Sequence, residues 1–321
     1  MVTRRIPGPA IDRVRERCRL DHHDGNEALP HDDLLRRLRG VDGVLLTSSD
    51  RVDDELLEAA GPQLRMVSSF GVGYDHIDVP ACTARSVMVG NTPDVLTEAT
   101  AELTWALILA AARRVGEGDR LIRRGDPWPV GLAVMLGMGV EGKVLGVVGL
   151  GRIGRAVARR GRAFGMRIVY HNRHRAAAEV EEALAAEYRQ LDELLGEADV
   201  VTLHTSLSEQ TRHLIDAGRL GLMKPTAVLV NASRGPVIDE TALVDALRNR
   251  RIFAAGLDVY ESEPHVDPGL LELENVVLAP HIGSATIETR TAMSDLAAEN
   301  LIEGVEGRRP PCLVNPEAWE R

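Results

Sequence analysis

Short runs of apolar residues recur along the chain, and most are separated by segments with helical periodicity. In the N-terminal third, residues 43–48, 64–70 and 87–91 are predicted to form buried strands, and residues 53–60 a helix. From residue 143 onward the pattern is regular, with Val-rich runs at residues 144–149, 166–170, 200–205, 227–232, 255–259 and 276–280. Because these runs are continuously apolar rather than alternating, they indicate strands of a parallel sheet that helices cover on both faces.

Four other segments and a C-terminal tail complete the predicted layout. Thr-Pro-Asp at residues 92–94 breaks the pattern, since proline cannot continue a strand ladder. A long apolar helix is predicted over residues 97–114, with its cap at Asp94 or Thr97. Residues 127–140 are uncharged and interrupted by Gly and Pro, which favours a buried loop or a subunit contact. The last helix is expected over residues 284–304, with an irregular tail behind it.

Composition narrows the class of protein. The 321 residues fit two domains at roughly 100–200 residues each. A net charge of −10 argues against nucleic acid or an anionic membrane as the main partner. Three widely spaced cysteines match neither a disulfide framework nor a metal site. No signal-peptide pattern and no apolar run of about 18 residues occur, so we expect a cytoplasmic protein without a membrane partner.

The most specific local motif is Gly-Leu-Gly-Arg-Ile-Gly at residues 149–154. It ends one predicted strand and opens a helix with an apolar stripe, as a dinucleotide-binding turn requires. Gly149 would permit the tight turn, Gly151 the approach of a pyrophosphate, and Gly154 the close packing of helix on strand. The helix start would favour the anion through its N–H groups and dipole. The alternative is an ordinary glycine-rich turn.

The end of the next strand bears on the choice of nicotinamide cofactor. A carboxylate there would accept hydrogen bonds from the adenosine ribose of NAD(H). Residues 170–175 instead read Tyr-His-Asn-Arg-His-Arg and contain no acid. Arginine can pair with a 2′-phosphate, so NADP(H) is expected to be preferred over NAD(H). The alternative is a solvated turn with incidental arginines.

Three chemically suitable residues follow consecutive predicted strands: Arg234, Glu263 and His281. Parallel strands end at one sheet edge, where open α/β folds bind ligands. Reduction of a 2-oxo acid needs a proton donor, which suits His281, and a cation for the carboxylate and carbonyl, which suits Arg234. Glu263 suits the orientation of the imidazole, and the cofactor carries the hydride. Taken singly, each residue also has a structural explanation.

Several ordered motifs resemble those of the D-2-hydroxyacid dehydrogenases. They are Asn-Ala-Ser-Arg-Gly at residues 231–235, Gly-Leu-Asp-Val-Tyr-Glu-Ser-Glu-Pro at 256–264 and Pro-His-Ile-Gly-Ser-Ala-Thr at 280–286. The resemblance runs from Phe-Gly-Val-Gly-Tyr-Asp-His-Ile-Asp at 70–78 to Val-Asn-Pro at 314–316, which is nearly the whole chain.

The resemblance implies a role for each matching residue. Arg234 would bind the substrate carboxylate and carbonyl, and His281 would be the acid/base with Glu263 as its partner. The backbone of Val72 and Gly73 would bind the substrate carboxylate. No metal is implied. The cofactor would meet a larger set of residues: Gly149, Gly151, Arg152, Ile153, Gly154 and Arg155 at the pyrophosphate, Asn172, Arg173 and His174 at the adenosine 2′ position, Asp258 at the nicotinamide carboxamide, and Ala232, Ser233 and Gly283 nearby.

The resemblance also implies the architecture and the branch of the family. The fold would be α/β, with two Rossmann-like doubly wound parallel-sheet domains. Residues 96–285 would bind the dinucleotide, and residues 1–95 and 286–321 would form a substrate-binding domain from both chain ends. Residues 91–101 look most like the glyoxylate/hydroxypyruvate reductases, which make glycolate or D-glycerate. Similar proteins are homodimers, and residues 97–114 and 127–140 would supply apolar contact surface.

Other functions on the same fold remain as alternatives. One is another 2-hydroxyacid dehydrogenase, of the phosphoglycerate or phosphite type. The chain length leaves no room for the regulatory domain of many phosphoglycerate enzymes, and the missing acid after the second strand disfavours the phosphite type. A non-enzymatic, dinucleotide-sensing corepressor-like protein is the other, which the short termini disfavour. Glu263 argues against a formate dehydrogenase, which lacks that carboxylate.

Overall fold

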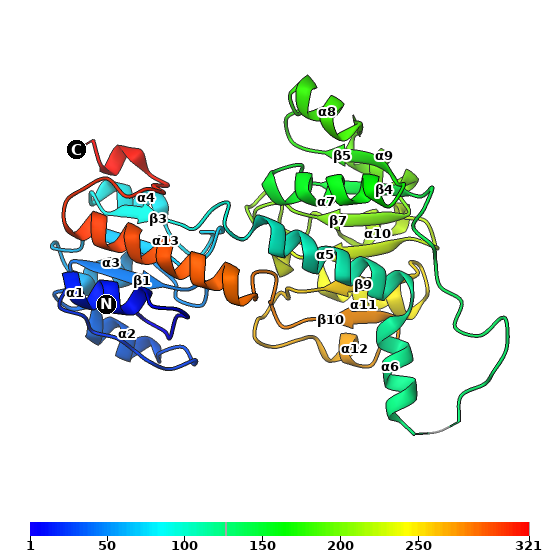
Figure 1. Ribbon diagram of the computed structural model, residues 1–321, viewed down its shortest axis with the longest axis horizontal. Coiled ribbons are helices and arrows are strands. Elements are labelled where there is room, and N and C mark those ends of the chain that lie inside the picture. Colours follow the sequence, from blue (N-terminus) through cyan, green and yellow to red (C-terminus); the bar gives the residue numbers. More distant parts are fainter. Residues whose placement is uncertain (126, 321) are drawn as a thin grey trace. The chain divides into compact units, whose positions relative to one another are not determined.

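The chain divides into two compact α/β units, seen in a computed structural model that describes residues 1–125 and 127–320 (Figure 1). Unit 1 comprises Met1–Leu96 and Ser284–Arg321, and unit 2 comprises Thr97–Gly283. Every strand pair within the two sheets is parallel. The parallel α/β class predicted from the continuous apolar runs is therefore confirmed.

Unit 1 is built on a three-stranded sheet in the order β1-β2-β3. Its strands are β1 (Gly43–Leu46), β2 (Met66–Ser69) and β3 (Met88–Gly90), each shorter than predicted. Val2 forms a parallel bridge with Leu45, so the chain start adds to the sheet edge. One face packs against α2 (His31–Leu38), α3 (Asp54–Ala60) and α4 (Val79–Ala84). The other face packs against α1 (Ala10–Arg17) and α13 (Ile287–Val305).

The C-terminal tail of unit 1 is irregular, as predicted, yet it is firmly attached to β3. Leu313 forms an antiparallel bridge with Gly90. The N–H of Val314 donates to the carbonyl of Val89 at 2.7 Å, and the N–H of Val89 donates to Oδ1 of Asn315 at 2.7 Å. The tail then ends in the short 3-10 helix η2 (Pro316–Ala318). One isolated bridge and the side chain of Asn315 therefore attach the tail to this edge of the three-stranded sheet.

Unit 2 holds a seven-stranded sheet in the order β10-β9-β8-β7-β4-β5-β6. The strands are β4 (Val144–Val148), β5 (Arg167–His171), β6 (Ala186–Tyr188), β7 (Val200–Leu203), β8 (Val228–Asn231), β9 (Ala254–Leu257) and β10 (Val276–Leu278). Every residue of β7, β8 and β9 is buried, which explains their continuously apolar runs. β6 escaped prediction because its sequence, Ala-Glu-Tyr, is short and not an apolar run.

Helices cover both faces of this sheet, so unit 2 is doubly wound. One face packs against α5 (Thr97–Ala112), α7 (Arg152–Ala163) and α8 (Ala178–Leu184). The other packs against α9 (Leu191–Glu197), α10 (Ala217–Leu222), α11 (Glu240–Arg248) and α12 (Pro268–Leu271). The 3-10 turn η1 (Gly235–Val237) follows β8. Trp105 of α5 stacks on Phe164, at the end of α7, with ring centroids 4.5 Å apart, so it packs one helix against the other.

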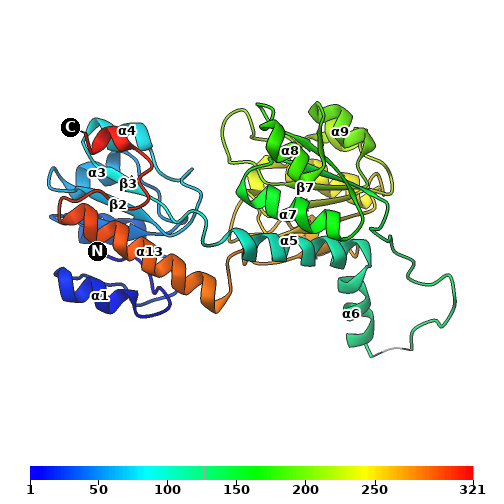
Figure 2. The same cartoon turned by 45° about the horizontal axis from the view of Figure 1, so that its top comes forward.

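Helix α6 (Val115–Arg123) and the segment at residues 127–140 extend away from the sheet of unit 2 in both views (Figures 1 and 2). The end of this segment returns to unit 2, where Met138 and Val140 pack against its core. Val130 is 94% exposed and Leu132 is 102% exposed, so the prediction of a buried loop is wrong. We call α6 and residues 127–140 the arm.

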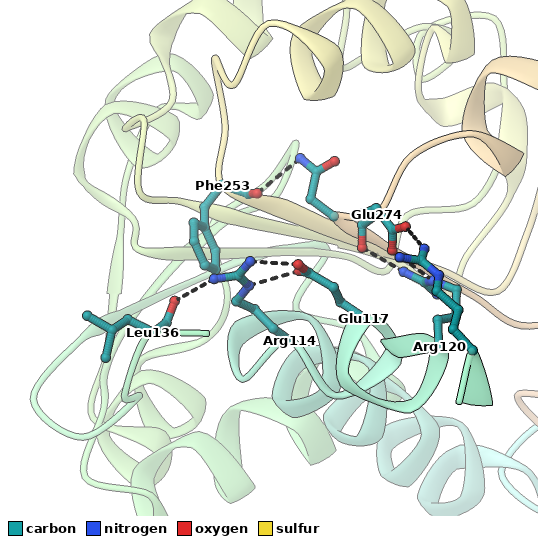
Figure 3. A network of polar contacts seen from close by, with 8 residues as sticks. Arg114, Glu117, Arg120, Leu136, Phe253 and Glu274 are labelled. Atoms are coloured by element: carbon teal, nitrogen blue, oxygen red, sulfur yellow. Dashed lines mark hydrogen bonds and ion pairs between the residues drawn. The ribbon is translucent and has the colours of Figure 1, made fainter. Parts of the chain in front are cut away.

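Polar contacts hold the base of the arm (Figure 3). Nε and a terminal nitrogen of Arg114 donate to the two carboxylate oxygens of Glu117 at 2.8 and 2.7 Å. Nε of Arg120 donates to Glu274, which directly precedes Asn275 and β10, at 3.1 Å. Since α6 has no buried residue, these ion pairs rather than apolar packing orient it on unit 2.

Candidate active site

The turn between β4 and α7 has the geometry that its three glycines imply. Gly149 adopts φ +102°, and a Cβ there would lie 2.7 Å from the carbonyl carbon of His204. A Cβ on Gly154 would lie 2.1 Å from the carbonyl oxygen of Gly149, so only glycine permits this packing of α7. A Cβ on Gly151 would meet nothing within 4 Å, which leaves that side of the turn open.

The first turn of α7 contains Arg152, Ile153 and Arg155. Gly151 is the N-cap residue and has no side chain to compete for the first N–H groups of the helix. Nε of Arg155 donates to the carbonyl of Leu150 at 3.2 Å and so braces the turn. A helix start of this kind suits an anion such as a pyrophosphate.

Asn172, just beyond β5, supports the same turn. Its Oδ1 accepts a hydrogen bond from the N–H of Leu150 at 2.6 Å. This contact orients the glycine turn from the neighbouring strand, a role that the sequence did not reveal. Its predicted contact with the adenosine 2′ position stays a prediction.

The three basic residues after Asn172 are all exposed, but they differ in their hydrogen bonding. Nε and a terminal nitrogen of Arg175 bind the carboxylate of Glu181 at 2.8 and 2.9 Å. Arg173 and His174 are exposed, and within residues 1–125 and 127–320 no hydrogen bond or ion pair engages them. The guanidinium available at this edge of the sheet is therefore that of Arg173.

Arg234, Glu263 and His281 lie beyond the carboxyl ends of β8, β9 and β10, which are neighbours in the sheet. Nδ1 of His281 lies 2.7 Å from Oε2 of Glu263. His281 has φ +53°, a conformation that costs a non-glycine residue about 1–2 kcal/mol. Strain of this kind is common at functional sites, and here the N–H of His281 is held by the carbonyl of Asp258 at 2.9 Å.

The environment of Glu263 keeps its carboxyl ionised. Burial alone would raise the pKa of this group, but the hydrogen bond and charge of His281 outweigh it and leave the pKa lowered. The N–H of Tyr260, which donates to Oε1 at 3.0 Å, and the charge of Arg234 lower the pKa further. An ionised Glu263 beside Nδ1 is suited to orient the imidazole.

Asp258 is almost fully buried at the end of β9. Its two carboxylate oxygens accept from the N–H groups of Ile282 at 2.7 Å and Gly283 at 2.8 Å. Burial raises the pKa of Asp258, while these two backbone hydrogen bonds oppose the rise. A Cβ on Gly283 would lie 3.2 Å from Oδ2, so glycine allows the close contact. Asp258 therefore supports the loop that follows His281, in addition to its predicted contact with the cofactor.

The turn of Ala232 and Ser233 that carries Arg234 is held by Asn231, a buried residue that the sequence analysis did not single out. Oδ1 of Asn231 accepts from the N–H and the hydroxyl of Ser233 at 3.0 and 2.8 Å, and its Nδ2 donates to the carbonyl of Arg234 at 2.9 Å. A polar residue at the end of an apolar strand was the available signal.

Val72 and Gly73 lie in unit 1, in the loop after β2. Nδ2 of Asn91 donates to the carbonyl of Val72 at 2.9 Å. Nδ2 of Asn300, on α13, donates in turn to the carbonyl of Asn91 at 2.9 Å, and the N–H of Cys312 donates to Oδ1 of Asn300 at 3.0 Å. These amides fix the predicted substrate loop, and neither asparagine was predicted to do so.

A doubly wound parallel sheet, an open glycine turn before α7 and a histidine–carboxylate pair at the strand ends define a dinucleotide-dependent dehydrogenase. The chain belongs to the D-isomer specific 2-hydroxyacid dehydrogenases, whose NAD-binding domain matches residues 105–283. The protein is therefore an oxidoreductase of this family, and the resemblance carried by its motifs is confirmed.

Relatives cover essentially the whole chain. It is 47% identical to a glyoxylate reductase of Thermococcus onnurineus over 99% of this chain and 96% of that protein. A protein of Thermus thermophilus with a known crystal structure is 45% identical, with a TM-score of 0.90 over 98% of both chains. An NADPH-dependent glyoxylate/hydroxypyruvate reductase of Sinorhizobium meliloti, in complex with NADP and malonate, is 33% identical, with a TM-score of 0.83 over 100% of this chain and 97% of that one.

None of the helices in the described ranges is long and apolar enough to cross a membrane. Those ranges also contain no group of three or more His, Cys, Asp or Glu side chains arranged to hold a metal ion.

Proposed function

We propose that this enzyme reduces glyoxylate or hydroxypyruvate to glycolate or D-glycerate, with a nicotinamide dinucleotide as the hydride donor. The observation that carries the proposal is the 2.7 Å contact between Nδ1 of His281 and Oε2 of Glu263, beyond adjacent parallel strands. A proton donor of this kind is what reduction of a carbonyl to an alcohol requires. The full-length relationship to a glyoxylate reductase supports the choice of acid.

Each residue of the proposed active site has a separate role in the reaction. Glu263 accepts the Nδ1 hydrogen of His281 and so leaves Nε2 to give a proton to the substrate oxygen. In the reverse direction the same nitrogen removes that proton. The guanidinium of Arg234 binds the substrate carboxylate and polarises the carbonyl. The bound dinucleotide supplies the hydride.

The dinucleotide is assigned to unit 2, which also carries Arg234 and His281. The open side of Gly151 and the start of α7 fit a pyrophosphate. The backbone of Val72 and Gly73 is assigned to the substrate carboxylate, supported by the hydrogen bond that holds Val72 in place. No side chain at Gly73 obstructs a ligand that approaches the main chain.

NADP(H) is proposed as the preferred cofactor over NAD(H). Residues 170–175 carry no acid that would repel a 2′-phosphate, and Arg173 is exposed and unengaged among the described residues. A guanidinium matches a phosphate in geometry and charge. The Sinorhizobium meliloti reductase, determined with NADP, offers a precedent in the family.

A homodimer is proposed as the working assembly, with the arm as its contact. An arm with side chains as exposed as Val130 and Leu132 presents apolar surface that a second copy would cover. We place the enzyme in the cytoplasm, since its three cysteines form no disulfide framework.

The decisive experiment follows the oxidation of NADPH and NADH by the purified protein with glyoxylate and with hydroxypyruvate. We expect turnover of both acids, faster with NADPH, and D-glycerate as the chiral product from hydroxypyruvate. Faster turnover with NADH would reject the cofactor preference and keep the reaction. Dinucleotide binding without turnover of any 2-oxo acid would reject the reaction and favour a dinucleotide-sensing protein.

A further inference from the structure

The loop between β9 and α12 carries two glutamates, two residues apart, and each contacts a different histidine. Oε2 of Glu263 pairs with Nδ1 of His281, as described above. Oε1 of Glu261 pairs with Nε2 of His213, which lies between β7 and α10. The second pair belongs to no part of the proposed reaction, yet it is attached to the same short loop.

The backbone of His213 is joined to the segment that carries Arg234. Its N–H donates to the carbonyl of Pro236, two residues after Arg234, at 2.8 Å. Ile215 continues this contact, because its N–H donates to the carbonyl of Val237 at 3.0 Å. His213 also adopts φ +48°, a strained conformation for a residue with a side chain. The main chain of His213 therefore contacts the Arg234 segment, and its imidazole contacts the loop that carries Glu261 and Glu263.

Backbone packing brings these segments into direct contact. A Cβ on Gly235 would lie 1.9 Å from the carbonyl carbon of Tyr260, so the main chain after Arg234 touches the main chain before Glu261. The hydroxyl of Tyr260 donates to the carbonyl of Ala279 at 2.8 Å, which ties the loop to the strand end that leads to His281. All three functional residues thus depend on how this one loop is held.

The carboxylates around the loop between β9 and α12 explain why a histidine beside Glu261 would stabilise it. Glu240 is nearly buried, and its Oε1 accepts from the N–H of Glu261 at 3.4 Å. Burial raises the pKa of Glu240, and the charges of Glu261, Asp267 and Glu263 raise it further. Several carboxylates therefore repel one another here, and the imidazole of His213 gives Glu261 a hydrogen-bonding partner on the opposite side.

We propose that His213 and Glu261 form a positioning pair that holds the Glu263 loop against the Arg234 segment. The two residues do not touch the reacting atoms; they set where Arg234 and the Glu263–His281 pair stand relative to each other. Misplacement of catalytic groups by about 1 Å can cost about a hundredfold in rate. The inference rests on the proposed function only for its kinetic readout.

The kinetic test compares His213→Ala and His213→Gln with a matched control. His213→Ala should lower kcat by about 10- to 100-fold, while KM and the dissociation constant of NADPH change by less than about threefold. Gln can still donate to Glu261, so His213→Gln should recover most of kcat. His31→Ala is the control: it removes another exposed histidine–glutamate pair, His31 with Glu55 at 3.2 Å in unit 1, and should leave kcat unchanged.

Three outcomes would overturn the proposal. The first is a folded His213→Ala variant with the kcat of the parent. The second is a loss of kcat that follows a loss of thermal stability and that His213→Gln does not recover. The third is a double variant, His213→Ala with Glu261→Ala, whose losses are the product of the single losses, since a pair that acts as a unit is not additive.

A crystal structure of the His213→Ala variant separates this inference from the proposed function. We expect the Glu263 loop to shift and the 2.7 Å contact between Oε2 and Nδ1 of His281 to lengthen, whatever acid the enzyme reduces. An unchanged loop and contact would refute the positioning pair even if glyoxylate is the substrate. Should the variant fail to fold, Glu261→Gln gives the same test with a smaller change in shape.

Discussion

The two units hold their functional loops with overlapping but not identical sets of interactions. In unit 1, neutral amides do this: Asn91 holds Val72, and Asn300, which is fully buried, holds Asn91. In unit 2, Asn231 and Asn172 hold their turns in the same way, but His281 is paired with an ionisable partner. The side chains of His281 and Glu263 are 40% and 34% exposed. A buried amide fixes the backbone at any pH, whereas a half-exposed pair can exchange protons with a ligand. Both units thus use neutral amides to fix backbone, and unit 2 adds the ionisable pair that is suited to proton transfer.

The largest effect is expected from removing the acid/base in unit 2. His281→Ala should lower turnover by about 10²- to 10⁴-fold, the range usual for a general acid, and should leave NADPH binding intact. Steady-state kinetics and a dinucleotide titration measure the two effects. His265→Ala, on the exposed part of the neighbouring loop, is the control. Turnover like that of the parent protein would remove His281 from its assigned role.

A smaller effect is expected from removing the central amide in unit 1. Asn300→Ala leaves the carbonyl of Asn91 and the N–H of Cys312 without their buried partner. Each unpaired buried group costs about 1–3 kcal/mol, so the loss of both partners should lower the free energy of unfolding by roughly 2–6 kcal/mol. The KM for the acid should rise more than the KM for NADPH.

Denaturant unfolding and kinetics check the Asn300→Ala prediction together. Asn249→Ala is the matched control, because in the described part of the chain the hydrogen bonds of that amide go to Asp245 on its own exposed helix end. Equal losses in the two variants would contradict the special role of the buried amides in unit 1.

Removal of Arg173, at the proposed cofactor-binding edge of unit 2, should have a still smaller effect. Arg173→Ala should raise the KM for NADPH by about 10- to 100-fold, since a hydrogen bond to a charged group is worth about 1.5–3 kcal/mol. The KM for NADH should change by less than about threefold, because NADH has no 2′-phosphate for Arg173 to bind. Arg175→Ala is the comparison, since Glu181 already neutralises that guanidinium. Equal losses with both cofactors would show that Arg173 does not read the 2′-phosphate.

The smallest effect is expected in the pH dependence of thermal stability. It distinguishes the ionisable pair of Glu263 from the neutral amide of Asn300. The pKa of Glu263 is lower in the folded protein than its ordinary value of 4.5, so the ionised carboxylate stabilises the fold above that pH. This contribution is lost as the pH falls through the lowered pKa. The difference in Tm between the parent and Glu263→Gln should therefore shrink on acidification. The difference for Asn300→Ala should stay constant. A constant difference for Glu263→Gln would contradict the lowered pKa.

Much of the architecture could be predicted because its signals are local. Continuous apolar runs predicted the parallel strands, and the position of Arg234, Glu263 and His281 after such runs brought them to one sheet edge. The partners that hold the site could not be predicted. Asn300 and Asn91 are 209 residues apart, and His213 and Glu261 are 48 apart, so only the fold brings them together.

The sequence provided no basis for choosing between two interpretations of residues 127–140, and it did not indicate the hydrogen bond that Asn172 makes. An uncharged segment at residues 127–140 fits burial in the chain as well as burial in a partner, and the exposure of Leu132 excludes the first. Asn172 was predicted to face the adenosine, but nothing in the sequence indicated that its Oδ1 would hold Leu150. Hydrogen-bond partners of this kind depend on strand order, which residues 167–171 do not encode by themselves.

The antiparallel attachment of the C-terminal tail to β3 has a consequence for protein synthesis. Unit 2 is one continuous stretch of chain, Thr97–Gly283, and all of its contacts are present once that stretch has left the ribosome. Unit 1 must wait, because α13 and Leu313, which bridges Gly90, follow unit 2 in the chain. During that interval β3 presents an uncovered edge to other nascent chains. Emergence of the segment around Leu313 is thus the event that closes this edge.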